Sequence, residues 1–514
     1  MDYTALAVFV VLFALVTVLG FVAARWQAGD LEVLHEWALA GRRFGTLVTW
    51  FVLGGDTYTA YTFVALPALV FGIGAPAFFA LPYTAIVFPL LFVIGPRFWT
   101  ISRKRHYITF GDFVRDRYDS RALELAVAWT GIAATMLYIG LQLVGLQVVI
   151  RALGFPSKGW LADIPVIVAF AILAAYTYRG GLRAPALVAV VKDILIYATV
   201  ITAIIVIPAK LGGFGHIFAA AQSALASAPK AASTMLAPSQ FSAYITLALG
   251  SGLALITYPH VMTATVSASS PNVIRRNMAL LPAYSILLGL LALFGYMAHA
   301  AGLHPASAND TVPDLLRTMF PSWFYGVGLA AIGIGALVPA AIMSIAAANL
   351  YTRNIHRVPP GVPVAGPAET AVAKSASLVI KAGALLAVLF LPAQYAIYYQ
   401  LFAGALILQT FPTIIFGLYT RWFHRVALFA GWVLSVVIAI LMIVTNNFAS
   451  TYPLTIFGTT VPGYIALWAF AVNLAVAVLL TFVLDAMKVP RGADHTSAAD
   501  YEEEAAGSVA PAVA

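Results

Sequence analysis

The chain has 514 residues, of which 62% are hydrophobic and only 9% are charged, and its mean hydropathy is +0.93. A soluble globular protein carries about 25% charged residues, so this composition excludes a water-soluble fold and makes lipid the solvent for most of the surface. The lack of cysteine excludes disulfides and thiolate metal sites. The net charge of +8 would suit a nucleic-acid partner, but the distribution of the basic residues explains it otherwise.

Hydropathy along the chain predicts thirteen transmembrane spans, because a helix needs about 20 mostly apolar residues to cross a bilayer. The spans cover residues 4–24, 45–72, 75–99, 123–153, 163–179, 186–208, 240–265, 279–301, 325–351, 375–397, 400–418, 426–446 and 463–485. Asp2 precedes the first span and no basic segment does, so we interpret this span as a retained helix rather than a signal peptide. The long loop 209–239 predicts one short surface helix.

Lys and Arg are unevenly divided between the two sets of loops that these spans define. One set holds 20 of the 28 basic residues and the other holds four. The positive-inside rule places the first set in the cytoplasm, with the N-terminus outside and the C-terminus inside. The basic excess is thus a topology signal, and no nucleic-acid partner is expected. The sequence has no GxxxxGK[ST] motif and no metal-ligand cluster, which argues against ATP-driven transport by this chain alone. We expect a bacterial inner-membrane protein that is not an enzyme and uses no cofactor beyond a coupling ion.

Four ionisable residues lie within the predicted spans: Asp56, Lys192, Asp193 and Lys381. Each costs roughly 2.5–3.5 kcal/mol on insertion scales, and such residues mark ion or substrate paths. Lys381 lies near the cytoplasmic end of its span, and we expect its long side chain to snorkel to the surface. Asp56 lies deep in span two and is too short to snorkel. It either caps a helix break or forms a cation or proton site.

Two spans contain signals that interrupt a helix. In span two, Gly54–Thr57 reads GGDT, and in span seven Gly250–Gly252 is followed by Pro259. Unwound backbone at membrane depth must be buried in protein or line a cavity, and secondary transporters place their sites at such discontinuous helices. The two spans are separated by the spacing of an inverted five-helix repeat, in which spans 2–6 match spans 7–11.

The side chains beside these two breaks form the predicted site. The predicted substrate ligands are Thr57, Tyr58, Thr59, Tyr61, Thr257 and Tyr258, and the predicted cation or proton groups are Asp56, Lys192, Asp193 and His260. The hydroxyl-rich set suits a small anion. His260 is either a packed, hydrogen-bonded residue or a proton carrier.

Five segments resemble the sodium:solute symporter family. They are EWALAGRRFG (36–45), YITFGDFVRDRYDSRALEL (107–125), YTYRGGLRAPALVAVVKD (176–193), YPHVMTATVSASSPNVIRR (258–276) and AAIMSIAAANLYTRNIHR (340–357). The resemblance implies an all-α membrane fold with a LeuT-type inverted-repeat core. Its expected divisions are an extra helix in 1–35, a ten-helix core in 36–418, two more helices in 419–487 and, from its polar composition, a disordered cytoplasmic tail in 488–514.

Within this family the sequence is most similar to the bacterial monocarboxylate permeases, on the stretch GGDTYTAY (54–61) and on the lack of a sugar-type polar cluster. The resemblance implies symport of pyruvate, lactate, acetate or propionate with a cation. A sodium-coupled carrier of another solute, such as proline, is one alternative, and a transporter-like membrane sensor is another. The oligomeric state is left open.

Two departures from the family pattern concern the coupling ion. The family's sodium site takes two hydroxyl residues from span nine, which would fall on Val338 and Pro339, and neither has a side-chain oxygen. The family's Thr-Asp pair in span six is Lys192-Asp193 here. We therefore expect protons rather than sodium to drive transport, with the Lys192 ammonium in the place of Na⁺. The alternative is that Lys192 snorkels to the cytoplasmic headgroups.

Overall fold

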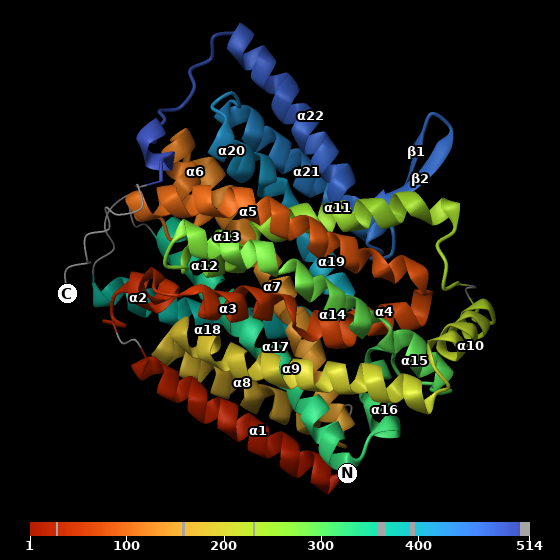
Figure 1. Cartoon of the computed structure of the whole chain (residues 1–514). Coiled ribbons are helices and arrows are strands. Elements are labelled where there is room, and N and C mark those ends of the chain that lie inside the picture. Colours follow the sequence, from red (N-terminus) through yellow and green to blue (C-terminus); the bar gives the residue numbers. More distant parts are fainter. Residues whose placement is uncertain (27–28, 157–159, 230–231, 357–365, 391–395, 504–514) are drawn as a thin grey trace.

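A computed structural model describes residues 1–26, 29–156, 160–229, 232–356, 366–390 and 396–503, except the side chains of 56, 57, 160–163, 387–390 and 456. Over these residues the chain is a helical bundle with one two-stranded hairpin (Figure 1). Ten helices in the described part are long and apolar enough to cross a membrane, and shorter apolar helices cover 46–55, 61–73 and 164–180. Together with α18, they coincide with all the predicted spans.

The bundle combines long helices with short ones. The long helices are α1 (Tyr3–Val22), α5 (Ala80–Lys104), α7 (Arg121–Ala152), α8 (Trp160–Gly180), α9 (Arg183–Lys210), α11 (Phe241–Thr257), α17 (Ser322–Leu350), α18 (Pro367–Phe390), α21 (Arg425–Thr445) and α22 (Ile465–Ala486). The shorter ones are α2 (Leu34–Leu39), α3 (Thr46–Thr57), α4 (Leu66–Ile73), α6 (Phe110–Tyr118), α10 (Phe214–Ala226), α12 (Pro259–Val266), α13 (Pro271–Leu280), α14 (Pro282–Ala292), α15 (Phe294–Ala300), α16 (Thr311–Met319), α19 (Ile397–Ile407) and α20 (Gly417–Tyr419). Single π-helical turns stand at η3 (Tyr61–Ala65), η7 (Tyr351–Ile355) and η9 (Pro412–Phe416).

Helix α17 forms the centre of the bundle. The most apolar 18-residue stretch of this helix is completely buried, and the helix packs against α1, α7 and α9. Its sequence is rich in Gly and Ala, which lets neighbouring backbones approach closely in a membrane. A methyl group on Gly326, for example, would lie 2.6 Å from the carbonyl oxygen of Ala5 in α1. By contrast, only 33% of the most apolar 18-residue stretch of α21 is buried, and only 22% of the most apolar stretch of α22. These two helices therefore face outward.

The two ends of the bundle carry different elements. One, here called the hairpin end, carries α10 and the hairpin of β1 (Thr451–Ile456) and β2 (Thr459–Tyr464), whereas α2 and α6 lie at the opposite end, here called the basic end (Figure 1). The surface helix expected in 209–239 is α10. The hairpin was not predicted from the sequence, and the described residues are otherwise helical, as expected. Phe457 and Gly458 both have positive φ, of 49° and 80°, as a tight two-residue hairpin turn requires.

Residues 488–503 also differ from the disordered tail that we expected. This segment folds back onto the basic end. Its ion pairs include Asp494–Arg117 at 2.6 Å, Asp500–Arg105 at 2.9 Å and Glu503–Arg275. A polar segment offers little apolar surface to bury and is therefore expected to stay disordered, but the arginines of the basic end provide counter-charges for its carboxylates. Residues 504–514 lie outside the described part.

Candidate functional site

The first break in the bundle separates α3 from η3. Tyr58 adopts an extended conformation, with φ −97° and ψ 93°, so the helix stops there. Threonine side chains replace some of the lost backbone bonds. Thr59 Oγ1 accepts from the N–H of Tyr61 at 2.9 Å, and Thr62 Oγ1 accepts from the N–H of Thr59 at 3.2 Å. The N–H of Ala60 donates to Gln142 Oε1 on α7 at 3.1 Å. The threonine hydroxyls of this sequence thus accept hydrogen bonds from backbone N–H groups that the break leaves without a helical partner.

The side chain of Lys192 reaches into this break from α9. Its Nζ donates to the carbonyl oxygen of Gly55 and, at 2.9 Å, to that of Tyr58. It also forms an ion pair with Asp193 Oδ1 at 3.0 Å, and both side chains are fully buried. Lys192 therefore does not snorkel to the headgroups. Backbone carbonyls freed by a helix break are the groups that coordinate coupling cations in discontinuous transporter helices.

Two tyrosines hold the other side of Asp193. Tyr284 on α14 donates its hydroxyl to Asp193 Oδ2 at 3.1 Å, and Tyr58 donates its hydroxyl to the carbonyl of Tyr284 at 2.6 Å. The centroids of the two rings are 4.6 Å apart. The buried carboxylate is thus hydrogen-bonded and paired, as a charge in a low-dielectric interior must be to persist.

Helix α17 runs beside α9 at the level of Lys192. A methyl group on Gly328 would lie 3.5 Å from Cγ2 of Thr199, and one on Gly335 would lie 3.8 Å from Cδ1 of Ile196. The next turn of α17 holds Val338 and Pro339. Both residues are buried and neither side chain carries an oxygen. In this region the ammonium of Lys192 is therefore the group that engages the carbonyls of the break.

The second break lies between α11 and α12. Tyr258 is extended, with φ −66° and ψ 134°, and Pro259 begins the next helix. The Tyr258 hydroxyl donates to the carbonyl of Gln400 at 3.3 Å, and the Thr257 hydroxyl donates to the carbonyl of Ala254 at 2.7 Å. His260 is fully buried, and its ring centroid lies 5.1 Å from that of Tyr258. This break is closed by aromatic packing.

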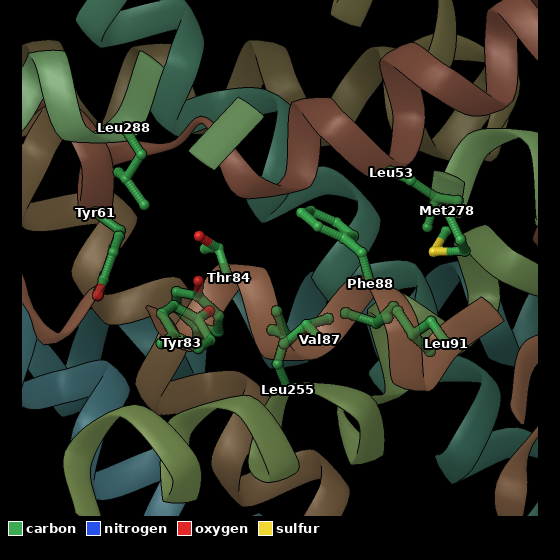
Figure 2. A pocket seen from close by; sticks show the side chains of 12 residues that line it. Leu53, Tyr61, Tyr83, Thr84, Val87, Phe88, Leu91, Leu255, Met278 and Leu288 are labelled. Atoms are coloured by element: carbon green, nitrogen blue, oxygen red, sulfur yellow. The ribbon is translucent and has the colours of Figure 1, made fainter. Parts of the chain in front are cut away.

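A small cavity lies between the two breaks. Residues on both sides of each break line it: Leu53 and Tyr61 at the first, and Leu255 and Val261 at the second. Helices α5, α7, α13 and α14 complete its wall. Figure 2 shows Tyr61, Tyr83 and Thr84 together at one end of this cavity, and Leu91 and Met278 at the other. The cavity thus has a hydroxyl-bearing end and an apolar end.

The structure brings only part of the predicted substrate set to the cavity. Tyr61 lines it, and its buried hydroxyl has no hydrogen-bond partner among the described residues. Tyr58 turns instead toward Tyr284, and Thr59 caps the break. Thr257 and Tyr258 bond to backbone carbonyls. The side chains of Asp56 and Thr57 lie outside the described part of the chain.

The cavity also contains residues that our interpretation of the sequence missed. Tyr83 and Thr84 come from α5, and Tyr138 comes from α7. The adjacent hydroxyls Tyr83-Thr84 in an otherwise apolar span were a signal that could have identified them. Lys381, which we expected to snorkel, is only 4% exposed. Its Nζ points back one turn to the carbonyl of Ser377 at 3.5 Å, so the side chain turns toward the basic end without leaving the protein.

Replacing Thr59 by valine is expected to reduce stability, because the N–H of Tyr61 would lose its acceptor inside the protein. An unsatisfied buried donor costs about 1–3 kcal/mol, which a lower midpoint of thermal unfolding in detergent would report. Thr445→Val is the matched control, since the Thr445 hydroxyl bonds only to a carbonyl of its own helix. An unchanged midpoint with weakened uptake would instead identify Thr59 as a substrate ligand.

Comparisons with known proteins agree on one family. The model of the sodium:solute symporter family matches residues 37–435. A monocarboxylate transport permease protein of Rhizobium johnstonii is 51% identical over 486 residues, which cover 94% of this chain and 97% of the relative. The sodium/pantothenate symporter of Escherichia coli is 25% identical over 294 residues, covering 55% of this chain and 56% of that protein.

A solved structure shares the fold. A Na⁺-coupled sialic acid symporter, in a substrate-bound outward-open state, superposes with a TM-score of 0.75 at 15% identity, covering 95% of this chain and 98% of that one. At this identity the similarity shows the fold alone. It confirms the expected LeuT-type transporter fold.

Proposed function

The chain belongs to the sodium:solute symporter family, and we propose that it takes up a small monocarboxylate, such as pyruvate, lactate, acetate or propionate, together with a proton. As a member of this family it is a multi-pass membrane transporter of a small solute. The substrate class rests on its 51% identity to a protein named as a monocarboxylate permease. The small cavity between the breaks, with hydroxyls at one end and apolar walls, is consistent with a short carboxylate.

Two unpartnered donors near the first break support an anionic substrate. The Tyr61 hydroxyl and the Gln142 Nε2 are buried and have no hydrogen-bond partner among the described residues. Gln142 Oε1 is fixed by the N–H of Ala60, which is adjacent to Tyr61. Gln142 also lies one helical turn from Tyr138, which lines the cavity. A carboxylate there would satisfy both donors. Thr57 stays a predicted third ligand.

Tyr61→Phe is expected to raise the KM for pyruvate about tenfold or more, because a hydrogen bond to a charged group contributes about 1.5–3 kcal/mol. The measurement is initial uptake of labelled pyruvate in proteoliposomes. Tyr296→Phe is the control, since Tyr296 is another buried tyrosine whose hydroxyl has no hydrogen-bond partner in the part of the chain that the structure describes, but its ring packs on Phe78 and Phe218. Equal KM values in both variants and the wild type would place the carboxylate elsewhere.

Proton coupling is supported by the position of Lys192. Its ammonium donates to the Gly55 and Tyr58 carbonyls. A bound cation would coordinate the same carbonyl oxygens if the lysine were absent. A lysine side chain can give up and regain a proton. In the protonated state Lys192 ties α9 to the break. When the proton leaves, this tie weakens and Asp193 loses its counter-charge, so the conformation of the break changes with protonation.

Uptake by the purified chain in proteoliposomes tests the proposal as a whole. We expect a pH gradient alone, acid outside, to drive accumulation of labelled pyruvate in sodium-free buffer, with competition by lactate and acetate. Accumulation driven only by sodium, with competition by proline, would establish the sodium-coupled alternative. Binding without accumulation would establish a transporter-like sensor. A pure transport cycle makes and breaks no covalent bond, so pyruvate should be recovered unchanged.

We further propose that the protein lies in a bacterial inner membrane with its basic end in the cytoplasm, as the positive-inside rule requires, and that residues 36–418 form the transporter core. Since the chain has no cysteine, single cysteines can report its orientation. In intact cells, a membrane-impermeant maleimide should label Phe457→Cys, at the exposed tip of the hairpin, and leave Arg276→Cys unlabelled. The reverse labelling pattern would show that the basic end lies outside the cell.

A further inference from the structure

A second pocket, at the basic end, is lined by four arginines. Arg117 comes from α6, Arg421 from the connection between α20 and α21, Arg425 from the start of α21, and Arg491 follows α22. Asp494 lines the pocket with them, and the volume of the pocket is about 270 Å³. These five residues define what is here called the arginine pocket. None of them belongs to the cavity between the helix breaks.

Positive charge exceeds negative charge in the arginine pocket. Asp494 Oδ2 is shared between Arg117 Nη1 at 2.6 Å and Arg421 Nε at 2.9 Å. Arg425 donates to the backbone carbonyl of Asp119 at 2.8 Å and has no ion pair within the described residues.

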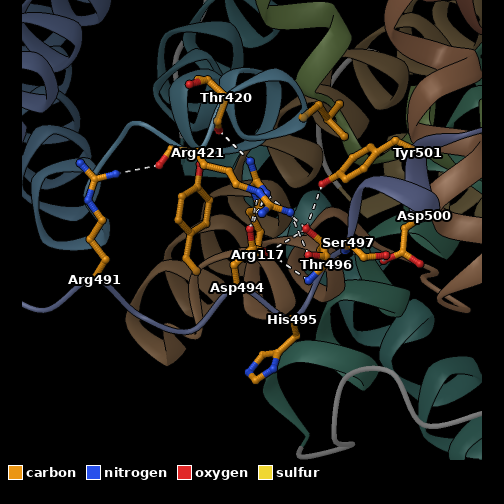
Figure 3. Close-up of polar contacts among 12 residues, drawn as sticks. Arg117, Thr420, Arg421, Arg491, Asp494, His495, Thr496, Ser497, Asp500 and Tyr501 are labelled. Carbon is orange, nitrogen blue, oxygen red and sulfur yellow. Dashed lines mark hydrogen bonds and ion pairs between the residues drawn. The ribbon is translucent and has the colours of Figure 1, made fainter.

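Arg491 completes the pocket. It pairs with Asp485 at the end of α22 and donates to the Arg421 carbonyl at 2.8 Å (Figure 3). Four guanidinium groups therefore meet two carboxylates, Asp494 and Asp485. An excess of one sign within a cleft focuses the field and attracts a counter-ion.

The arginine pocket lies beside the lipid-facing part of the bundle. Helix α21 begins at Arg425, and α22 ends a few residues before Arg491. Trp422 stands next to the pocket, with its ring centroid 5.1 Å from that of Phe482 on α22, and Phe482 is 60% exposed. Tryptophan at the end of an outward-facing helix is typical of the headgroup level of a bilayer.

We propose that the arginine pocket binds a phosphate group, carried by the headgroup of an anionic phospholipid or by a soluble phosphate compound. The planar guanidinium fork matches phosphate oxygens bidentately, and basic pockets between transmembrane helices recognise anionic headgroups. Asp494 already engages Arg117 and the Nε of Arg421, so the phosphate would be held mainly by Arg425, with the remaining donors of Arg421 and Arg491 beside it. The proposal depends on neither the substrate nor the coupling ion.

Thermal unfolding of the purified full-length chain in a neutral detergent tests this binding. The probes are short-chain phosphatidylglycerol, inorganic phosphate and, as the uncharged headgroup, phosphatidylcholine, all at one ionic strength. We expect the unfolding midpoint to rise with a phosphate anion and not with phosphatidylcholine. The double variant Arg421→Gln/Arg425→Gln should need roughly tenfold more of the same probe or more. The control, Arg103→Gln/Arg276→Gln, removes two exposed arginines of the same end and should respond like the wild type.

The outcomes separate the two sources and decide the proposal. A response to phosphatidylglycerol but not to inorganic phosphate assigns the site to lipid, and a response to both at similar concentrations assigns it to a soluble phosphate. Asp494→Asn removes the competing carboxylate and should bind the probe more tightly. This variant tests phosphate binding even if the double arginine variant does not fold. No response to either phosphate probe, an equal loss in the control, or weaker binding by Asp494→Asn would overturn the proposal.

Discussion

Proton-driven accumulation of pyruvate is expected to vanish when Lys192 is replaced by methionine, while exchange of pyruvate across the membrane continues. Methionine keeps the length and apolar body of the side chain but removes the ammonium that contacts Gly55, Tyr58 and Asp193. A one-proton symporter at equilibrium concentrates its substrate about tenfold for each pH unit, because one unit corresponds to about 1.4 kcal/mol. Without the titrating group the accumulation ratio should fall to about one.

A second buried lysine provides the control for this experiment. Lys381 is also buried in the bundle, and within the described residues it forms no ion pair and bonds only to the Ser377 carbonyl. Lys381→Met should therefore keep pH-driven accumulation. If sodium drives uptake by the wild type and Lys192→Met accumulates pyruvate normally, the coupling proposal is wrong.

The fold of Lys192→Met needs its own check. Removing one member of a buried ion pair leaves the other charge uncompensated and destabilises by about 3–5 kcal/mol. The variant Lys192→Met/Asp193→Asn removes both charges of the pair, so it should recover much of the unfolding midpoint that Lys192→Met loses. Recovery of stability without recovery of accumulation would separate the coupling role of Lys192 from its structural role.

The sequence was sufficient to predict the spans and the two helix breaks. Long apolar runs determine where helices cross, and the backbone chemistry of Gly54-Gly55 and Pro259 determines where a helix can stop. The structure places the extended residues at Tyr58 and Tyr258, next to these signals. Local sequence carries this information because each break depends on a few consecutive residues.

The use of each polar group at the breaks could not be predicted in the same way. A hydroxyl can bind a substrate or cap its own backbone, and the choice depends on what packs beside it. Thr59 bonds to the N–H of Tyr61, whereas the Tyr61 hydroxyl lines the cavity without a partner in the described part of the chain. The direction of Lys192 likewise depends on the packing of α9 against α3, two helices distant in sequence.

The tail and hairpin were missed for a related reason. Composition describes what a segment can bury, and it does not reveal counter-charges supplied from far along the chain. Asp494 forms ion pairs with Arg117 and Arg421, and no local sequence pattern indicates these pairs. The hairpin instead has a local signal, consecutive β-branched residues on both sides of Phe457-Gly458, which is masked by its place between two strongly apolar helices.

A large loss of stability is also expected for Asp112→Ala at the basic end. Asp112, at the start of α6, accepts from Arg353 Nε at 3.2 Å, from Asn354 Nδ2 at 3.0 Å and from the N–H groups of Ile108 and Thr109 at 2.9 and 3.3 Å. The side chains of Asp112 and Arg353 are both fully buried. Together these bonds attach α6 to the end of α17.

Asp112→Ala removes all four of these bonds and leaves the guanidinium of Arg353 buried, with only Glu369 at 3.7 Å to balance it. A loss of about 3–5 kcal/mol follows from breaking a buried pair, measured as a lower unfolding midpoint and a lower yield. Arg353→Met should cost less, because Asp112 keeps its other three donors. The double variant should cost less than the sum of the two single losses, since both act on one network. A larger loss for Arg353→Met than for Asp112→Ala would show that the arginine, through Glu369, is the main link between α17 and its neighbours.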